Sequence, residues 1–154
     1  MEPEPRPGET AASVGGTVRA DGAPPWVLVC DDTASIRLLI RINLELAGFE
    51  VREAGDGEGA LALLRATRDR PPAVLILDAQ MRPMDGWEAI AEIRSDPELH
   101  DLPVVMVTAA LQQRERERSV AAGVDAFVAK PFEPEALVDL VGALATSGRP
   151  APPP

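Results

Sequence analysis

Three short apolar runs constrain the fold of this chain more than any other feature. They cover residues 26–30, 74–77 and 104–107, and a polar residue immediately follows each of them. Runs this short and this apolar are typical of strands buried on both faces, which occur in parallel sheets covered by helices. Stretches of helical length separate the runs. The pattern therefore predicts an α/β protein built around a parallel sheet.

Two more strand signals and five helical stretches complete the pattern. The segment 50–54 is polar enough for an edge strand, and residues 126–129 form the last short run. The predicted helices are, in order, about 34–47, about 57–67, one that starts near Gly86, about 111–122 and about 134–145. This alternation predicts right-handed βαβ crossovers with helices on both faces of the sheet. Periodicity alone leaves the order of the strands open.

Local signals mark where several helices begin and end. Gly48 is placed to end the first helix with a positive φ, and Gly123 follows the fourth. Asp56 and Asp85 are expected to cap two other helices. The single cysteine, Cys30, lies in an apolar run and is expected to be a small core residue. The first helix is expected to have an apolar set that consists of Ile36, Leu39, Ile40, Leu44 and Leu46.

Composition narrows the class of protein. The chain has 154 residues, a net charge of −10 and 45% hydrophobic residues, which is enough for one core. The acidic balance argues against a nucleic-acid partner, and no apolar segment approaches the ~20 residues of a membrane helix. The first ten residues do not form a signal peptide, so a cytoplasmic protein is expected. Proline-rich segments 1–25 and 146–154 are expected to be disordered tails around a domain at 26–145.

Polar side chains follow the apolar runs at the points where strands should end. Asp31 and Asp32 follow one run, and Asp78, Thr108 and Lys130 each follow or close another. The carboxyl ends of parallel strands lie at one edge of a sheet, where ligands bind. Carboxylates in one cleft resist ionising together, and a hard cation such as Mg²⁺, which prefers oxygen ligands, removes that conflict. The set suits a divalent cation and a phosphoryl group.

In order, spacing and context these residues resemble the receiver domain of two-component response regulators. The resemblance covers about residues 26–145, and its motifs are VLVCDD (27–32), LILDAQMRPMDG (75–86), VVMVTA (104–109) and FVAKPF (127–132). It implies a doubly wound, flavodoxin-like (βα)5 fold with five parallel strands in the order 2-1-3-4-5.

The resemblance also implies a role for each site residue. Asp78 would be the phosphoacceptor, which receives a phosphoryl group from a sensor histidine kinase or a phosphotransfer protein. Asp32, Asp78 and the backbone carbonyl of Gln80 would bind Mg²⁺ directly. Asp31 would act mainly through a metal-bound water. Lys130 would pair with Asp78 and then with the phosphoryl oxygens.

The remaining implied roles concern signal output. Thr108 would hydrogen-bond the phosphoryl group, and Phe127, which stands where many relatives have tyrosine, would be a switch residue or simply a core residue. No further domain is expected after residue 145, so output would be contact with a downstream target protein, by a monomer or a phosphorylation-dependent dimer. The protein would be a switch with at most slow autodephosphorylation and not an enzyme in the usual sense.

Two alternatives remain open at the level of sequence. One is a receiver-fold interaction module that works without phosphorylation, which the complete set of polar residues disfavours. The other is an aspartyl-phosphate phosphatase of the haloacid dehalogenase type. Those enzymes carry their nucleophile after the first strand in a D-x-D arrangement, whereas Asp78-Ala79-Gln80 lacks the second aspartate.

Overall fold

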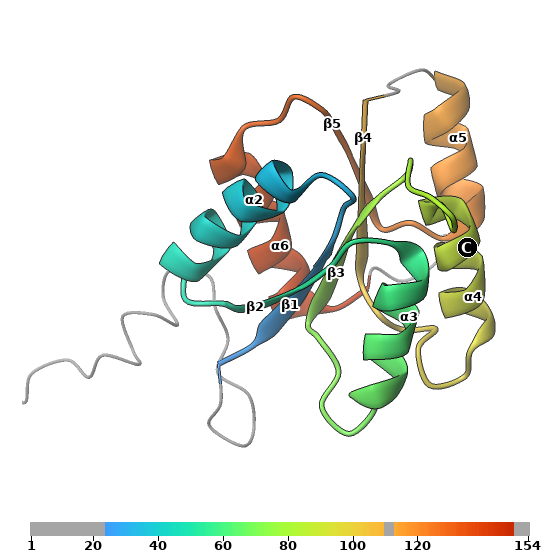
Figure 1. Cartoon of the computed structure of the whole chain (residues 1–154), viewed down its shortest axis with the longest axis horizontal. Helices are drawn as coiled ribbons and strands as arrows, with labels where there is room; N and C mark the ends of the chain where they lie inside the picture. The colour runs from blue at the N-terminus through green and yellow to red at the C-terminus, as the bar shows by residue number, and fades with distance from the viewer. Residues whose placement is uncertain (1–23, 110–112, 150–154) are drawn as a thin grey trace, which may run out of the picture.

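The structure of the protein, a computed structural model, describes residues 24–109 and 113–149, without the side chains of 113–116 and 119. Strands and helices alternate along the chain (Figure 1). The elements are β1 (Trp26–Cys30), α2 (Ala34–Leu46), β2 (Glu50–Ala54), α3 (Gly57–Ala66), β3 (Val74–Asp78), α4 (Gly86–Ser95), β4 (Val104–Thr108), α5 (Gln113–Ala122), β5 (Ala126–Ala129) and α6 (Pro134–Ser147).

The five strands form one parallel sheet in the order β2-β1-β3-β4-β5. This confirms the predicted doubly wound fold, including the strand order that the family resemblance implied. The register pairs Cys30 with Leu77, Asp78 with Val107, and Thr108 with Ala129. The strands that carry the polar residues therefore end almost level with one another at a single edge of the sheet.

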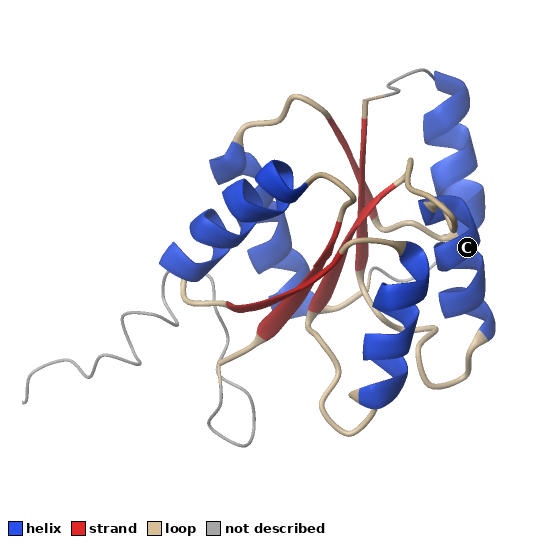
Figure 2. Ribbon diagram, viewed as in Figure 1, coloured by secondary structure: helices blue, strands red, loops and turns tan. Residues whose placement is uncertain are grey.

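Helices cover both faces of the sheet, with α2 and α6 on one face and α3, α4 and α5 on the other (Figure 2). Every residue of β1, β3 and β4 is buried, as expected of strands covered on both sides. Along β1 the side chains alternate between the two cores: Leu28 packs on the α3 side and Val29 on the α2 side. The two edge strands are less buried.

The predicted helix boundaries agree with the structure at the sites that local chemistry specifies. The Asp56 carboxylate accepts a hydrogen bond from the Gly59 amide at 2.7 Å, and Asp85 accepts one from Glu88 at 2.8 Å. Gly48 and Gly123 have φ values of 97° and 88°. Helix α6 runs to Ser147, slightly beyond its predicted end, and the predicted start of α5 at Leu111 lies outside the described residues.

The expected apolar set of α2 is wrong in part. Ile40 and Leu44 are buried against the sheet, whereas Leu39 and Leu46 are exposed. Successive helical residues are separated by about 100°, which turns Leu39 and Leu46 well away from the direction of Ile40. The helix therefore has more apolar residues than its core-facing stripe can bury.

An ionic network lies at the end of the sheet where β4 and β5 begin. Asp125, whose side chain is 4% exposed, accepts hydrogen bonds from Arg94 at 3.0 Å, Arg149 at 2.8 Å and the Val104 amide at 2.8 Å. Burial is the main cause that lowers the pKa of Arg94 below its usual range. The network joins α4, the start of β5 and the segment after α6.

We expect Asp125→Ala to lower the free energy of unfolding by about 3 kcal/mol, because it leaves the largely buried Arg94 guanidinium without its counter-charge. Urea unfolding measures this. Arg65→Ala is the control, since the Arg65–Glu92 pair is exposed and contributes about 0.5 kcal/mol or less. Equal effects of the two substitutions would contradict a structural role for the network.

Candidate functional site

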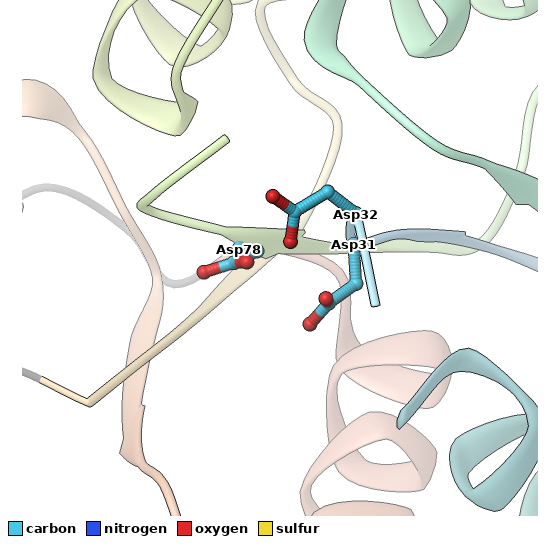
Figure 3. A group of neighbouring side chains, drawn as sticks. All are labelled: Asp31, Asp32 and Asp78. Atoms are coloured by element: carbon cyan, nitrogen blue, oxygen red, sulfur yellow. The ribbon is translucent and has the colours of Figure 1, made fainter. Parts of the chain in front are cut away.

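Three aspartates gather at the carboxyl edge of the sheet. Asp31 follows β1 directly, and the pairing of Cys30 with Leu77 places it beside Asp78 at the end of β3. One carboxylate oxygen from each of Asp31, Asp32 and Asp78 lies within 4.8 Å of the others. Figure 3 shows the three side chains grouped where β1 and β3 end. Asp31 and Asp78 are buried, whereas Asp32 is exposed.

Lys130 joins this cluster from the far side of β4. Its Nζ atom lies 2.9 Å from Asp31 Oδ2 and 3.4 Å from Asp78 Oδ2, and its side chain is 18% exposed. Burial lowers the pKa of Lys130, but the hydrogen bond to Asp31 and the charge of Asp78 outweigh burial, so the net shift is upward. The Lys130–Pro131 peptide bond is cis, as the sequence allowed. The ammonium is thus charged and directed at two carboxylates.

The electrostatics of Asp78 favour a cation at this site. Burial is the main cause that raises the pKa of Asp78, and the charge of Asp31 raises it further. The Gln80 backbone amide, which donates to Asp78 Oδ1 at 3.1 Å, and the Lys130 ammonium both lower it. The net shift is upward. One ammonium does not neutralise three neighbouring carboxylates. A hard divalent cation would supply the missing positive charge, and carboxylate oxygens are its preferred ligands. The residues present therefore fit such an ion.

The other predicted site residues lie around this cluster at different distances from it. Thr108 is buried at the end of β4, and its carbonyl accepts a hydrogen bond from the Lys130 amide at 2.9 Å. Gln80 contacts the cluster through its backbone amide, which donates to Asp78. Phe127 pairs with Met106 within the sheet and packs partly against the core on the α3 side. It lies on β5, three residues before Lys130, and takes no part in the acidic cluster.

Cys30 is a core residue, as predicted, although it lies next to Asp31. It is fully buried, and its thiol contacts the Asp56 carbonyl at 3.1 Å. Burial, followed by the charges of Asp56 and Asp31, raises its pKa to about 12. A thiol in this environment is not a nucleophile at neutral pH.

Sequence reasoning missed two residues that shape the site. Arg37 donates to the Asp31 carbonyl and pairs with Glu53 at 3.0 Å, which ties α2 to the loop that carries the aspartates. Gly86 lies so close to the loop after β3 that a Cβ atom there would be 2.4 Å from the Asp78 carbonyl oxygen. The motif includes this glycine, but only the folded loop shows why a larger residue cannot replace it.

Comparison of the chain with known protein families agrees with this geometry. The model of the response regulator receiver domain matches residues 27–142. The chain belongs to this family, which consists of signalling switches that interact with histidine kinases and downstream targets and typically bind a divalent metal in an acidic pocket. The match decides against the phosphatase alternative.

Curated and solved relatives support the assignment. The chain is 36% identical over 126 residues to the phosphate regulon transcriptional regulatory protein PhoB of Rhizobium meliloti, covering 82% of this chain and 54% of PhoB. The chemotaxis response regulator CheY4 of Vibrio cholerae is 32% identical with a TM-score of 0.72, over 78% of this chain and 98% of CheY4. The phosphorylated cyanobacterial phytochrome response regulator RcpA is 26% identical with a TM-score of 0.68, over 80% of this chain and 94% of that one.

Two further expectations concern a nucleic-acid partner and a membrane helix. The chain spans about half the length of the curated relatives that it matches, and these are transcriptional regulators. The expected absence of a nucleic-acid partner therefore stays a prediction. Within residues 24–109 and 113–149, no helix is long and apolar enough to cross a membrane.

We expect Gly86→Ala to destabilise the protein by about 1–3 kcal/mol, because its Cβ would overlap the Asp78 backbone. Helix propensity alone predicts the opposite sign, a gain of about 1 kcal/mol, since Gly86 begins α4. Gly55→Ala is the matched control, because the nearest atom to its new Cβ is 3.8 Å away. Thermal and urea unfolding decide the sign, and a stabilised Gly86→Ala variant would contradict the close packing of this loop.

Proposed function

We propose that this protein is a phosphorylation switch in which Asp78 accepts a phosphoryl group from a phosphohistidine on a sensor histidine kinase or a phosphotransfer protein. The observation that carries the proposal is the position of Lys130, whose ammonium contacts both buried carboxylates, Asp31 and Asp78, at 2.9 and 3.4 Å. The proposed location is the cytoplasm, which is consistent with the family.

The proposed cation is Mg²⁺. Asp32, Asp78 and the backbone carbonyl of Gln80 would hold it, and Asp31 would contribute through a bound water. When bound, the ion offsets negative charge on the phosphoryl oxygens. The close approach of the three carboxylates, within 4.8 Å, supports this ligand set. The Gln80 backbone carbonyl is proposed from the family resemblance, and the Gln80 backbone amide contacts Asp78 Oδ1.

The proposed reaction forms one bond and breaks one. A carboxylate oxygen of Asp78 attacks the phosphorus of the phosphohistidine, the new O–P bond forms, and the N–P bond breaks. The imidazole nitrogen keeps the bonding electron pair and takes up a proton from solvent. Lys130 neutralises charge on the transferred group, and catalysis otherwise depends on positioning, as is usual for phosphoryl transfer.

The acyl phosphate adds about −1.5 to −2 charges at neutral pH. Thr108, one residue past the partner of Asp78 in the sheet, would hydrogen-bond the phosphoryl group. A shift of Thr108 would then be transmitted along β4 and β5 toward Phe127, which pairs with Met106. The proposed output is contact with a target protein, as a monomer or a phosphorylation-dependent dimer, with at most slow autodephosphorylation. RcpA, a relative solved in its phosphorylated form, supports the phosphorylation step.

Incubation with Mg²⁺ and acetyl phosphate is expected to add one phosphoryl group, seen by intact mass. Asp78→Asn should abolish the adduct, and chelation of Mg²⁺ should strongly reduce it, because the carboxylates then repel the incoming phosphate. Lys130→Ala should still bind Mg²⁺, measured by calorimetry, but should lose phosphorylation-dependent target binding.

Asp101→Asn is the control for loss of one carboxylate, since the Asp101 side chain is 88% exposed and takes no part in the acidic cluster. It should be phosphorylated like the parent protein. An adduct that persists in Asp78→Asn would contradict the assignment of the phosphoacceptor. No adduct with acetyl phosphate or any phosphohistidine donor would instead favour the phosphorylation-independent interaction module.

A further inference from the structure

Helix α2 exposes most of the large apolar side chains that face solvent in the described residues. Four of the five lie on it, and the fifth is Val120. The four residues of α2 are Leu38, Leu39, Ile42 and Leu46. Leu46 is the most exposed of them at 81%, and it lies at the last position of the helix. A contiguous exposed apolar surface of this kind marks an interaction site.

A groove of about 330 Å³ runs beside Leu46, between α2 and α6, which lie next to each other on one face of the sheet (Figure 1). Its lining residues are Asn43, Leu46, Ala47, Glu135, Val138 and Asp139. Glu135 and Asp139 are separated by one helical turn, so their carboxylates border the same side. Neither of them makes an ion pair within the described part of the chain. The groove thus combines an apolar wall with an unpaired acidic rim.

The N-terminal end of the described chain, at Pro24 and Pro25, lies near this groove. The Pro25 carbonyl accepts a hydrogen bond from the Glu50 amide at 3.0 Å, and Glu50 follows Ala47 closely in sequence. An extended chain spans about 3.3–3.6 Å per residue, so Ala47 lies within roughly 11 Å of Glu50. By the same measure, the chain from Pro25 back to Val18 spans up to roughly 25 Å. Residues near position 18 can therefore reach the groove.

The composition of residues 1–23 indicates which part of this segment is suited to bind the groove. Its only basic residues are Arg6 and Arg19, and Arg19 directly follows the aliphatic Val18. An apolar side chain beside a guanidinium is what an apolar wall with two carboxylates would bind, because arginine forms bidentate hydrogen bonds with carboxylates. A second copy of this chain, with a net charge of −10, would bring more negative charge to the same rim.

We propose that Val18 and Arg19 cover this groove in the same molecule, with Val18 against Leu46 and Val138, and Arg19 paired with Glu135 and Asp139. The short connection to Pro25 gives an effective concentration in the millimolar range, so a weak contact suffices. The covering segment shortens the apolar face of α2 that other proteins can contact. A protein that docks along the whole of α2 must displace it.

Paramagnetic broadening in the full-length protein tests this proposal. A nitroxide on Ala20→Cys labels the segment selectively, because the native Cys30 is fully buried and does not react. We expect the amide signals of Leu46 and Val138 to broaden, whereas that of Glu92, on the opposite face of the sheet, should not. Arg19→Glu should reduce the broadening by about twofold or more, in line with loss of an exposed ion pair. Arg6→Glu is the matched control and should leave it unchanged.

Three results would overturn the proposal. One is the absence of broadening at Leu46 and Val138. Another is an equal effect of Arg19→Glu and Arg6→Glu. The third is broadening in a mixture of spin-labelled, isotopically unlabelled chains with isotope-labelled chains that carry no nitroxide, because it would show that the occupant is a second copy.

Discussion

The register of the parallel sheet is the constraint on which the rest of the site depends. Because Cys30 pairs with Leu77 and Thr108 pairs with Ala129, residues that are up to about a hundred positions apart end at one edge. Asp31, Asp78 and Lys130 need no long loops to meet. A slip of one residue in β3 would turn Asp78 to the other face of the sheet and dissolve the cluster.

The balance of charge at the carboxyl edge of the sheet is the second constraint on the site. Asp31 and Asp78 are almost completely buried, and burial of an unpaired carboxylate is costly. Lys130 relieves part of this cost, yet the pKa of Asp78 remains raised, mainly by burial. The site is therefore left with an excess of negative charge that a cation removes. This excess supports the proposal that the same edge binds first a metal ion and then a phosphoryl group beside it.

The sequence predicted most of the architecture because the strongest signals were local. Pure apolar runs identified the buried strands, and caps such as Asp56 and Asp85 marked helix starts. Strand order came only from the family resemblance, since periodicity carries no information about which strands are neighbours. The polar residues that the sequence singled out, Asp31, Asp78 and Lys130, do meet in the structure.

What the sequence did not reveal depends on tertiary packing. The sequence shows that Leu39 and Leu46 are apolar, but it does not show which side of the helix packs against the sheet. The predicted apolar set of the helix therefore includes both residues, although both are exposed. The need for Gly86 becomes apparent only when the loop after Asp78 folds back on it. The network around Asp125 joins α4 to the segment after α6 across many residues, and no spacing rule predicts such a contact.

The most direct test of the central claim is to locate the acyl phosphate chemically. Borohydride cleaves an aspartyl phosphate and leaves homoserine at that position, which peptide mass spectrometry identifies after treatment of the protein with acetyl phosphate and Mg²⁺. We predict homoserine at position 78 alone. Homoserine at position 31 or 32, or its absence from a protein whose intact mass shows the adduct, would contradict it.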